Sequence, residues 1–150
     1  MAVPHRLLCA AALTVAVAVP AAASDADLPA GPIHDRHELM EEIGANAKKI
    51  GDAMKSGARD QVAAPARAIR DAAAKVLPLF PEGSLHPKSR ALDTIWKDWV
   101  GYEKSNKEFE DAAAALVVAA ESGSAELPQA VKRMFDSCKS CHEAFRAPEE

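Results

Sequence analysis

Three residues near the C-terminus, Cys138, Cys141 and His142, have the types and spacing that attach a c-type haem. If this segment is helical, the three side chains leave the helix on one side, with the cysteine β-carbons roughly 5–6 Å apart. Two thiols on one face can add to the two vinyl groups of one porphyrin, and the adjacent imidazole can bind its iron. Lys139 and Ser140 point elsewhere and need no part in this chemistry. The motif therefore predicts one covalently bound haem c per chain.

Two other chemistries use a similar cysteine pair. A thioredoxin-like dithiol lies at the start of a helix that follows a strand, where the helix N-terminus lowers a thiol pKa. No strand pattern precedes Cys138. A zinc site needs four ligands, and the sequence has no second cysteine pair to supply them. We therefore expect haem rather than a redox-active dithiol or a zinc ion.

Residues 1–23 have the pattern of a secretory signal peptide. His5 and Arg6 form a short basic segment, an apolar run covers 7–19, and small residues at 21–23 precede the expected cleavage point. The apolar run is shorter than the roughly 20 residues that cross a bilayer, so an uncleaved anchor is the weaker alternative. We expect cleavage after residue 23 and export of the remaining chain.

The remaining chain, 24–150, is long enough for a single domain with a modest core. Cys9 lies in the signal, so the only two cysteines of the mature chain are those of the haem motif. With 18 basic and 22 acidic residues and a net charge of −4, the sequence offers no electrostatic basis for binding nucleic acid. No membrane span is expected after signal cleavage.

Apolar residues spaced alternately three and four apart predict amphipathic helices and no strands. The helices are expected over about 35–55, 60–77, 89–121 and 124–147. Asp60 and Ser124 are expected to cap the second and fourth helices. The expected inward positions are Arg36, Met40, Ile43, Ala47, Ile50 and Met54 in the first helix and Leu127, Val131, Met134, Cys138, Cys141 and Phe145 in the last. Two short connections and one longer one predict an all-α, up-down-up-down four-helix bundle with covalently bound haem c.

The chain resembles the class II c-type cytochromes, which are cytochrome c′ and its low-spin relatives. The resemblance rests on the 138–142 motif followed by Glu143-Ala144-Phe145-Arg146, on Arg36-His37-Glu38-Leu39-Met40 with Gly44, and on Ile95-Trp96. It covers essentially the whole mature chain. It implies a periplasmic bacterial haem protein with a four-helix bundle and redox partner proteins.

In that family, the residue four positions after the first-helix arginine lies over the open face of the haem. Low-spin members carry methionine there, and high-spin members carry a side chain that cannot bind iron. The corresponding residue is Met40, so the resemblance implies the low-spin branch with His142 and Met40 as axial ligands. A methionine on an inward stripe is also ordinary core filler, and this interpretation stays open. His37 is the other candidate ligand, whereas His34 and His86 are expected in solvated or structural roles.

The resemblance also implies two residues of the haem environment. Arg36 corresponds to an arginine that approaches a haem propionate. Arg146 corresponds to a basic residue beside the proximal imidazole, although an arginine at a helix end also complements the helix dipole. Apart from the resemblance, Trp96, Trp99 and Tyr102 are candidates to line the haem pocket, although aromatic residues at helical spacing also serve as plain core. Of the two tryptophans, Trp96 is the one expected to contact the haem.

The function favoured by the sequence is one-electron transfer between partner proteins, and the chain is not expected to be an enzyme. A second hypothesis is a haem protein with five-coordinate iron or a displaceable Met40 that binds or senses nitric oxide or carbon monoxide. A third is a structural helical bundle without haem. Members of the resembling family often form homodimers, so a homodimer is a further hypothesis.

Overall fold

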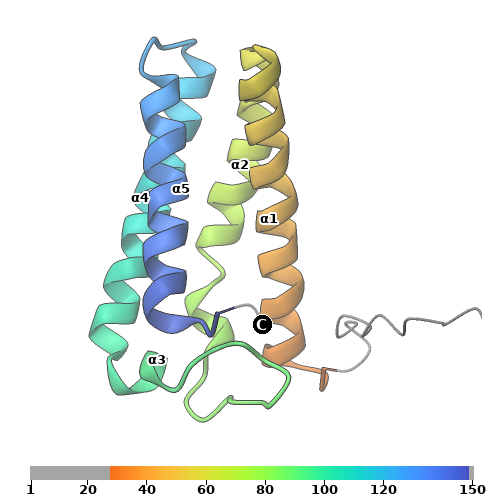
Figure 1. Ribbon diagram of the computed structural model, residues 1–150, viewed down its shortest axis with the longest axis vertical. Coiled ribbons are helices and arrows are strands. Elements are labelled where there is room, and N and C mark those ends of the chain that lie inside the picture. The colour runs from red at the N-terminus through yellow and green to blue at the C-terminus, as the bar shows by residue number, and fades with distance from the viewer. Residues whose placement is uncertain (1–27, 149–150) are drawn as a thin grey trace, which may run out of the picture.

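The computed structural model describes residues 28–148, and the predicted signal peptide lies outside the described residues. Four long helices lie side by side and alternate in direction, which confirms the predicted four-helix bundle (Figure 1). The elements are α1 (Pro32–Ser56), η2 (Arg59–Gln61), α2 (Ala63–Ala73), η3 (Leu77–Leu79), α3 (Thr94–Lys97), α4 (Trp99–Glu121) and α5 (Leu127–Phe145). The start of α1, the end of α5 and the long η3–α3 connection gather at one end of the bundle (Figure 1).

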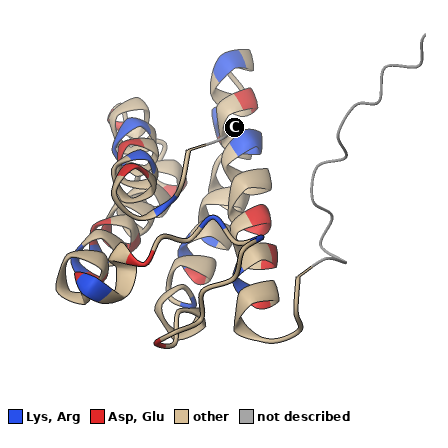
Figure 2. Ribbon diagram, turned by 60° about the horizontal axis from the view of Figure 1, so that its bottom comes forward, with Lys and Arg blue, Asp and Glu red and all other residues tan. Residues whose placement is uncertain are grey.

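Charged residues of both signs are interspersed over the outer faces of the helices (Figure 2). Several form exposed pairs four residues apart, such as Lys48 with Asp52 and Lys139 with Glu143. Such pairs contribute little to stability because water screens them. Among the helices of residues 28–148, none is both long and apolar enough to span a membrane.

The boundaries of α1 and α2 differ from the predicted ones. α1 begins earlier, at Pro32, whose fixed φ suits a first helical position. It ends at Ser56, close to the predicted end, and Gly57, whose φ of 76° allows a left-handed turn, closes the helix. The prediction of Asp60 as an N-cap is wrong, since Asp60 lies in η2 and makes no capping hydrogen bond. α2 ends at Ala73, because the backbone then tightens into three-residue turns.

The predicted third helix is wrong over its first turns. Residues 89–93 are not helical, because the backbone of Arg90 and Leu92 bonds to the end of α5 instead. The short α3 then stops at Asp98, whose carboxylate accepts a hydrogen bond from the Gly101 N–H at 3.1 Å and caps α4. A β-carbon at position 101 would collide with that carboxylate, so glycine permits this tight junction.

α5 begins and ends inside its predicted range. Ser124 does not cap the helix, which starts at Leu127. Its hydroxyl instead accepts a hydrogen bond from the Glu126 N–H at 3.1 Å in the preceding turn. The helix ends at Phe145, before Pro148, because Arg146 adopts an extended backbone conformation.

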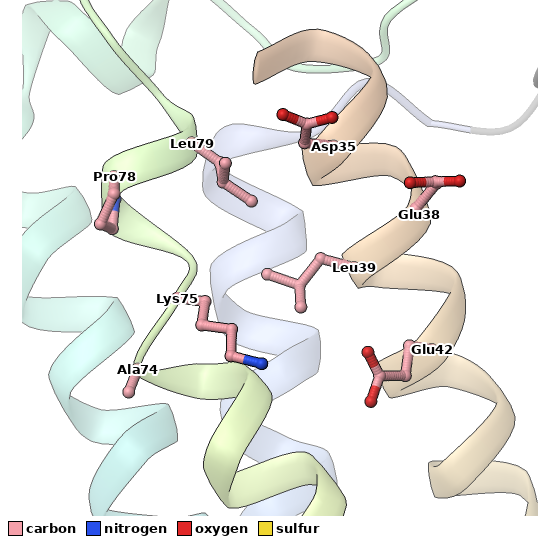
Figure 3. A pocket seen from close by; sticks show the side chains of 8 residues that line it. All are labelled: Asp35, Glu38, Leu39, Glu42, Ala74, Lys75, Pro78 and Leu79. Carbon is pink, nitrogen blue, oxygen red and sulfur yellow. The ribbon is translucent and has the colours of Figure 1, made fainter. Parts of the chain in front are cut away.

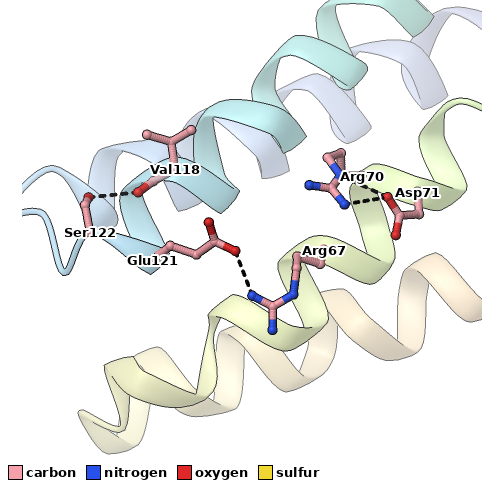
Figure 4. A network of polar contacts seen from close by, with 6 residues as sticks. All are labelled: Arg67, Arg70, Asp71, Val118, Glu121 and Ser122. Carbon is pink, nitrogen blue, oxygen red and sulfur yellow. Dashed lines mark hydrogen bonds and ion pairs between the residues drawn. The ribbon is translucent and has the colours of Figure 1, made fainter.

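Several residues of α2 and α4, which pack against each other, are completely buried. Ile69 and Leu116 have no exposed surface, and the small alanines around them allow the two helices to pack closely. The residues with 0% exposure on these helices are Ala66, Ile69, Ala73, Ala113 and Leu116. At the end away from the long connection, Arg67 Nη1 lies 2.7 Å from Glu121 Oε1 and links their outer faces (Figure 4).

The inward stripe predicted for α1 is correct only in part. Its buried residues are Arg36, Leu39, Ile43, Asn46, Ile50 and Ala53. Met40, Ala47 and Met54, which we call the open flank of α1, pack against the core but remain half-buried. On α5, Cys138 and Cys141 are half-buried in the same way, beside a fully buried Met134. The interior is thus shifted toward the side of α1 that α2 covers.

Candidate functional site

The haem motif lies in the last two turns of α5. Cys138 and Cys141 are free, half-buried thiols one helical turn apart. The pKa of each thiol is raised to about 11. Burial is the cause for Cys141, and burial together with the nearby Cys141 is the cause for Cys138. Both are therefore protonated near neutral pH, whereas a redox-active dithiol has a lowered thiol pKa. The site does not have the electrostatics of a thioredoxin-like centre.

Nor does the motif form a compact metal site. Over the described part of the chain, one group of His, Cys, Asp and Glu side chains brings its ligand atoms within metal-binding distance, and it consists of His34, Asp35 and Glu38. These lie on the first turns of α1, where His34 Nδ1 is 3.5 Å from Glu38 Oε2. Cys138, Cys141 and His142 are not such a group, as expected for residues that bind separate points of a large planar cofactor.

His142 follows the second cysteine and is half-buried. Burial lowers the pKa of its imidazole, and the nearby guanidinium groups of Arg146 and Arg90 lower it further. Low pKa favours the neutral imidazole, which is the form that coordinates iron. The surroundings of His142 therefore favour the neutral form in which its imidazole can bind iron.

Met40 lies on the side of α1 that faces away from α2. The opposite side of α1 borders a cavity of about 490 Å³ against α2 and η3 (Figure 3). The cavity is lined by Asp35, Glu38, Leu39, Glu42, Ala74, Lys75, Pro78 and Leu79. With 3.6 residues per turn, Met40 projects away from the acidic residues of that cavity. α5 also contacts α1 and runs beside it (Figure 1), so α5 is a long helix available to the open flank of α1.

Tyr102 of α4 is buried in the interior and interacts with residues of α5 and α1. It is 3% exposed, and its ring lies edge-on to Phe145 of α5 with centroids 5.2 Å apart. Burial raises the pKa of its hydroxyl, Cys141 raises it further, and Arg36 opposes the shift. A residue of α5 and a residue of α1 thus act on the same buried hydroxyl. Met40 follows Arg36 by one turn on α1, and both Met40 and Cys141 pack against the core cluster that contains Tyr102.

Arg36 is a buried cation whose hydrogen bonds go to neutral groups. Its side chain donates to Ser84 Oγ at 2.8 Å, to the Ser84 carbonyl at 2.7 Å and to Ser89 Oγ at 3.0 Å. Its guanidinium also lies 4.9 Å from the centroid of the Phe80 ring. Arg36 is 4% exposed, and burial lowers its pKa. A buried cation of this kind favours a nearby anion, such as a haem carboxylate.

The other predicted residues are distributed around this end of the bundle. Trp96 Nε1 donates to the carbonyls of Phe80 and Pro81 at 3.1 and 3.0 Å and so anchors the long connection. His37 Nε2 lies 3.6 Å from Glu41 Oε1 on the outer side of α1. His34 pairs with carboxylates on α1, and His86 Nδ1 accepts a hydrogen bond from the Lys88 N–H.

Sequence reasoning missed Arg90, Ser84 and Ser89. Ser84 and Ser89 bond Arg36 from about fifty residues away in the chain, and Arg90 reaches the end of α5 over a similar separation. No periodicity or short motif marks them, because they lie in the irregular connection. Their places depend on how that connection crosses the end of the bundle.

The comparisons agree on one family. The family model described as Cytochrome C′ matches residues 31–146. A cytochrome c′ of Rhodospirillum rubrum is 32% identical over 146 residues, which are 95% of this chain and 98% of the relative. The solved structure of cytochrome c prime from Shewanella frigidimarina is 28% identical with a TM-score of 0.73, covering 83% of this chain and 98% of its own. A cytochrome c′ described as having an unusual ligand-controlled dimer dissociation is 28% identical with a TM-score of 0.72, covering 85% and 100%.

Proposed function

Because the chain belongs to the cytochrome c′ family, whose members carry one covalently attached haem c, we propose that it is an exported one-electron carrier. Proteins of this family are electron carriers or gas-binding haem proteins rather than conventional enzymes. The observation that carries the proposal is the half-buried motif of Cys138, Cys141 and His142 in the last two turns of α5. The same helix end packs through Phe145 on Tyr102, and another ring neighbour of Tyr102, Phe80, lies 4.9 Å from the Arg36 guanidinium of α1.

The proposed attachment uses the three residues of the motif. Cys138 and Cys141 would hold the haem through thioether bonds, formed when each thiol adds its S–H across one haem vinyl group, and His142 would bind the iron. The free, protonated thiols and the neutral imidazole provide the donor set that this requires. When bound, the haem supplies an iron atom that gains and loses one electron. The chain's part is to hold the haem, shield it from water and set its potential.

Met40 is the proposed second protein ligand to the iron, and its thioether would make the haem low-spin. Two features support this assignment: Met40 is half-buried on the open flank, and it lies one turn from Arg36. A thioether favours the reduced iron and raises the potential relative to a second histidine. In the same arrangement Arg36 faces a propionate, Arg146 stands beside His142, and Trp96 holds the connection that closes the haem end.

Replacing Met40 by alanine tests this ligation. Met40→Ala should convert a low-spin spectrum into a high-spin one and open the iron to carbon monoxide. Met54→Ala is the matched control, since it removes a methionine from the same flank of α1 about four helical turns away. A low-spin spectrum that survives in Met40→Ala would refute the assignment, and equal changes in both variants would do so as well.

Export is part of the proposal. Residues 1–23 are proposed to direct the chain to the periplasm and to be removed after residue 23, leaving 24–150 to meet redox partner proteins. Intact mass of the exported holoprotein tests this. The expected mass is that of residues 24–150 plus one haem, whereas a retained Cys9 would contradict cleavage.

A second candidate function is reversible binding of nitric oxide or carbon monoxide. It is favoured by the likeness to a cytochrome c′ whose dimer dissociates under ligand control. Met40 would then be a displaceable cap, and the chain would form a homodimer. Rapid carbon monoxide uptake by the reduced wild type, with a change in sedimentation, supports this candidate. Slow or absent uptake favours the electron carrier.

A further inference from the structure

The end of α5 is bonded to the long connection by a short antiparallel ladder. Ala91 and Arg146 form the bridge, the Leu92 N–H donates to the Phe145 carbonyl at 3.0 Å, and the Ala147 N–H donates to the Arg90 carbonyl at 2.8 Å. Thr94 Oγ1 adds a bond to the Ala144 carbonyl at 3.2 Å. The residues that follow His142 are therefore fixed by a segment some fifty positions earlier.

The side chain of Arg90 folds back onto this ladder. Its Nε and Nη2 donate to the Ala147 carbonyl at 3.1 and 2.7 Å, so one guanidinium grips one carbonyl through two N–H groups. The neighbouring Arg146 N–H donates to the His142 carbonyl at 3.1 Å, so the carbonyl that Arg90 binds lies one residue beyond the turn that starts at His142. Arg90 from the long connection and Arg146 from the end of α5 are thus both tied to the segment that follows His142.

We propose that Arg90 is a positioning residue that holds the segment after His142 in place and supplies a second proximal positive charge that raises the haem potential. This inference rests on the proposed function. Reduction adds one electron to the haem, and a nearby fixed cation favours that added negative charge. The ladder fixes the distance over which the cation acts, and the two-pronged geometry is specific to arginine.

Potentiometric titration of the haem-loaded protein tests whether the positive charge of Arg90 raises the haem reduction potential. Arg90→Gln and Arg90→Met remove it, and either one suffices if the other loads haem poorly. At a fixed solution potential, each should shift the oxidised-to-reduced ratio roughly fivefold toward the oxidised form. Arg90→Lys retains the charge and should stay near the wild type, although it loses part of the two-pronged grip and unfolds at a lower temperature. Lys107→Gln, an exposed cation paired along α4, is the control and should leave the ratio unchanged.

Two results would overturn the inference. One is a potential that stays at the wild-type value in Arg90→Gln and Arg90→Met, even if the melting temperature falls, because Arg90 would then be purely structural. The other is an equal fall of potential in Arg90→Lys and Arg90→Gln, because charge would then not be the cause. Failure of the proposed function is distinct from both, since it appears in the wild type, as rapid carbon monoxide uptake by the reduced protein or as the absence of haem absorbance.

Discussion

The α2–α4 side of the bundle and the α1–α5 side are closed to different degrees. Where α2 and α4 pack together, Ile69, Leu116 and three alanines of these helices have no exposed surface. On α1 and α5, the residues that would complete a similar contact, Met40, Cys138 and Cys141, stay half-buried. The same helical periodicity therefore produces fully buried residues between α2 and α4 and half-buried residues on α1 and α5.

The difference separates stability from function within one fold. A closed apolar contact contributes hydrophobic free energy without any cofactor. A half-buried stripe contributes less, and in this chain it carries all the proposed haem ligands. We infer that the α2–α4 side stabilises the bundle and the α1–α5 side is completed by the haem.

The largest expected effect is on haem attachment. Replacing Cys138 and Cys141 together by serine removes both nucleophilic sulfurs, so no thioether can form. Haem should then be extracted completely from the denatured protein, whereas the wild type retains it through denaturing electrophoresis. Ser137→Ala, beside the motif, is the control and should keep its haem. Covalent haem in the double serine variant would exclude the proposed attachment.

A cavity on the closed side should cost stability without changing the haem. Leu116→Ala removes a side chain with no exposed surface, and such substitutions destabilise by about 2–5 kcal/mol. Denaturant unfolding of the holoprotein measures this cost. The optical spectrum at low denaturant should match the wild type. A changed spin state in Leu116→Ala would show that the two sides are not independent.

Alkaline pH should act through Tyr102, the only tyrosine of the chain. Its pKa is raised in the folded protein by burial, so the folded state keeps the phenol proton above the usual pKa of about 10. Its contribution to stability is therefore full below that pH and declines as the pH rises further. Tyrosinate absorbance should stay absent until unfolding, and Tyr102→Phe should lose this pH dependence. Tyrosinate formation near its ordinary pKa in folded protein would argue against a buried hydroxyl.

The smallest expected effect is at the ion pair between α2 and α4. Arg67 and Glu121 are both about half-exposed, so Arg67→Ala should change the free energy of unfolding by less than about 1 kcal/mol. Denaturant unfolding at low and high salt checks this value. A loss as large as that in Leu116→Ala would mean that the closed side depends on charge rather than on packing.

Much of the fold follows from periodicity. The four long helices and the inward places of Ile43, Ile50 and Met134 follow from the apolar spacing, and the bundle prediction is confirmed. The first turns of the third predicted helix are not helical, because Leu92 bonds to Phe145 rather than to its own neighbours. Local spacing carries no information about such a distant partner.

The site was predictable only where a short motif marked it. The Cys138–His142 motif predicts the haem, which the family confirms, whereas Met40 was proposed through resemblance and stays a prediction. The half-burial of Met40 could not be read from its stripe, since it depends on which side of α1 is covered by α2. Arg90 had no sequence signal, because its role depends on the path of the long connection.

The most direct test of the account is the optical spectrum of the wild-type holoprotein in its oxidised and reduced states. With His142 and Met40 both on the iron, the reduced protein should show the sharp bands of a low-spin c-type haem. The oxidised protein should show the weak long-wavelength band of a methionine–iron bond. A broad, high-spin spectrum in both states would contradict Met40 ligation, and the absence of haem absorbance would contradict the account as a whole.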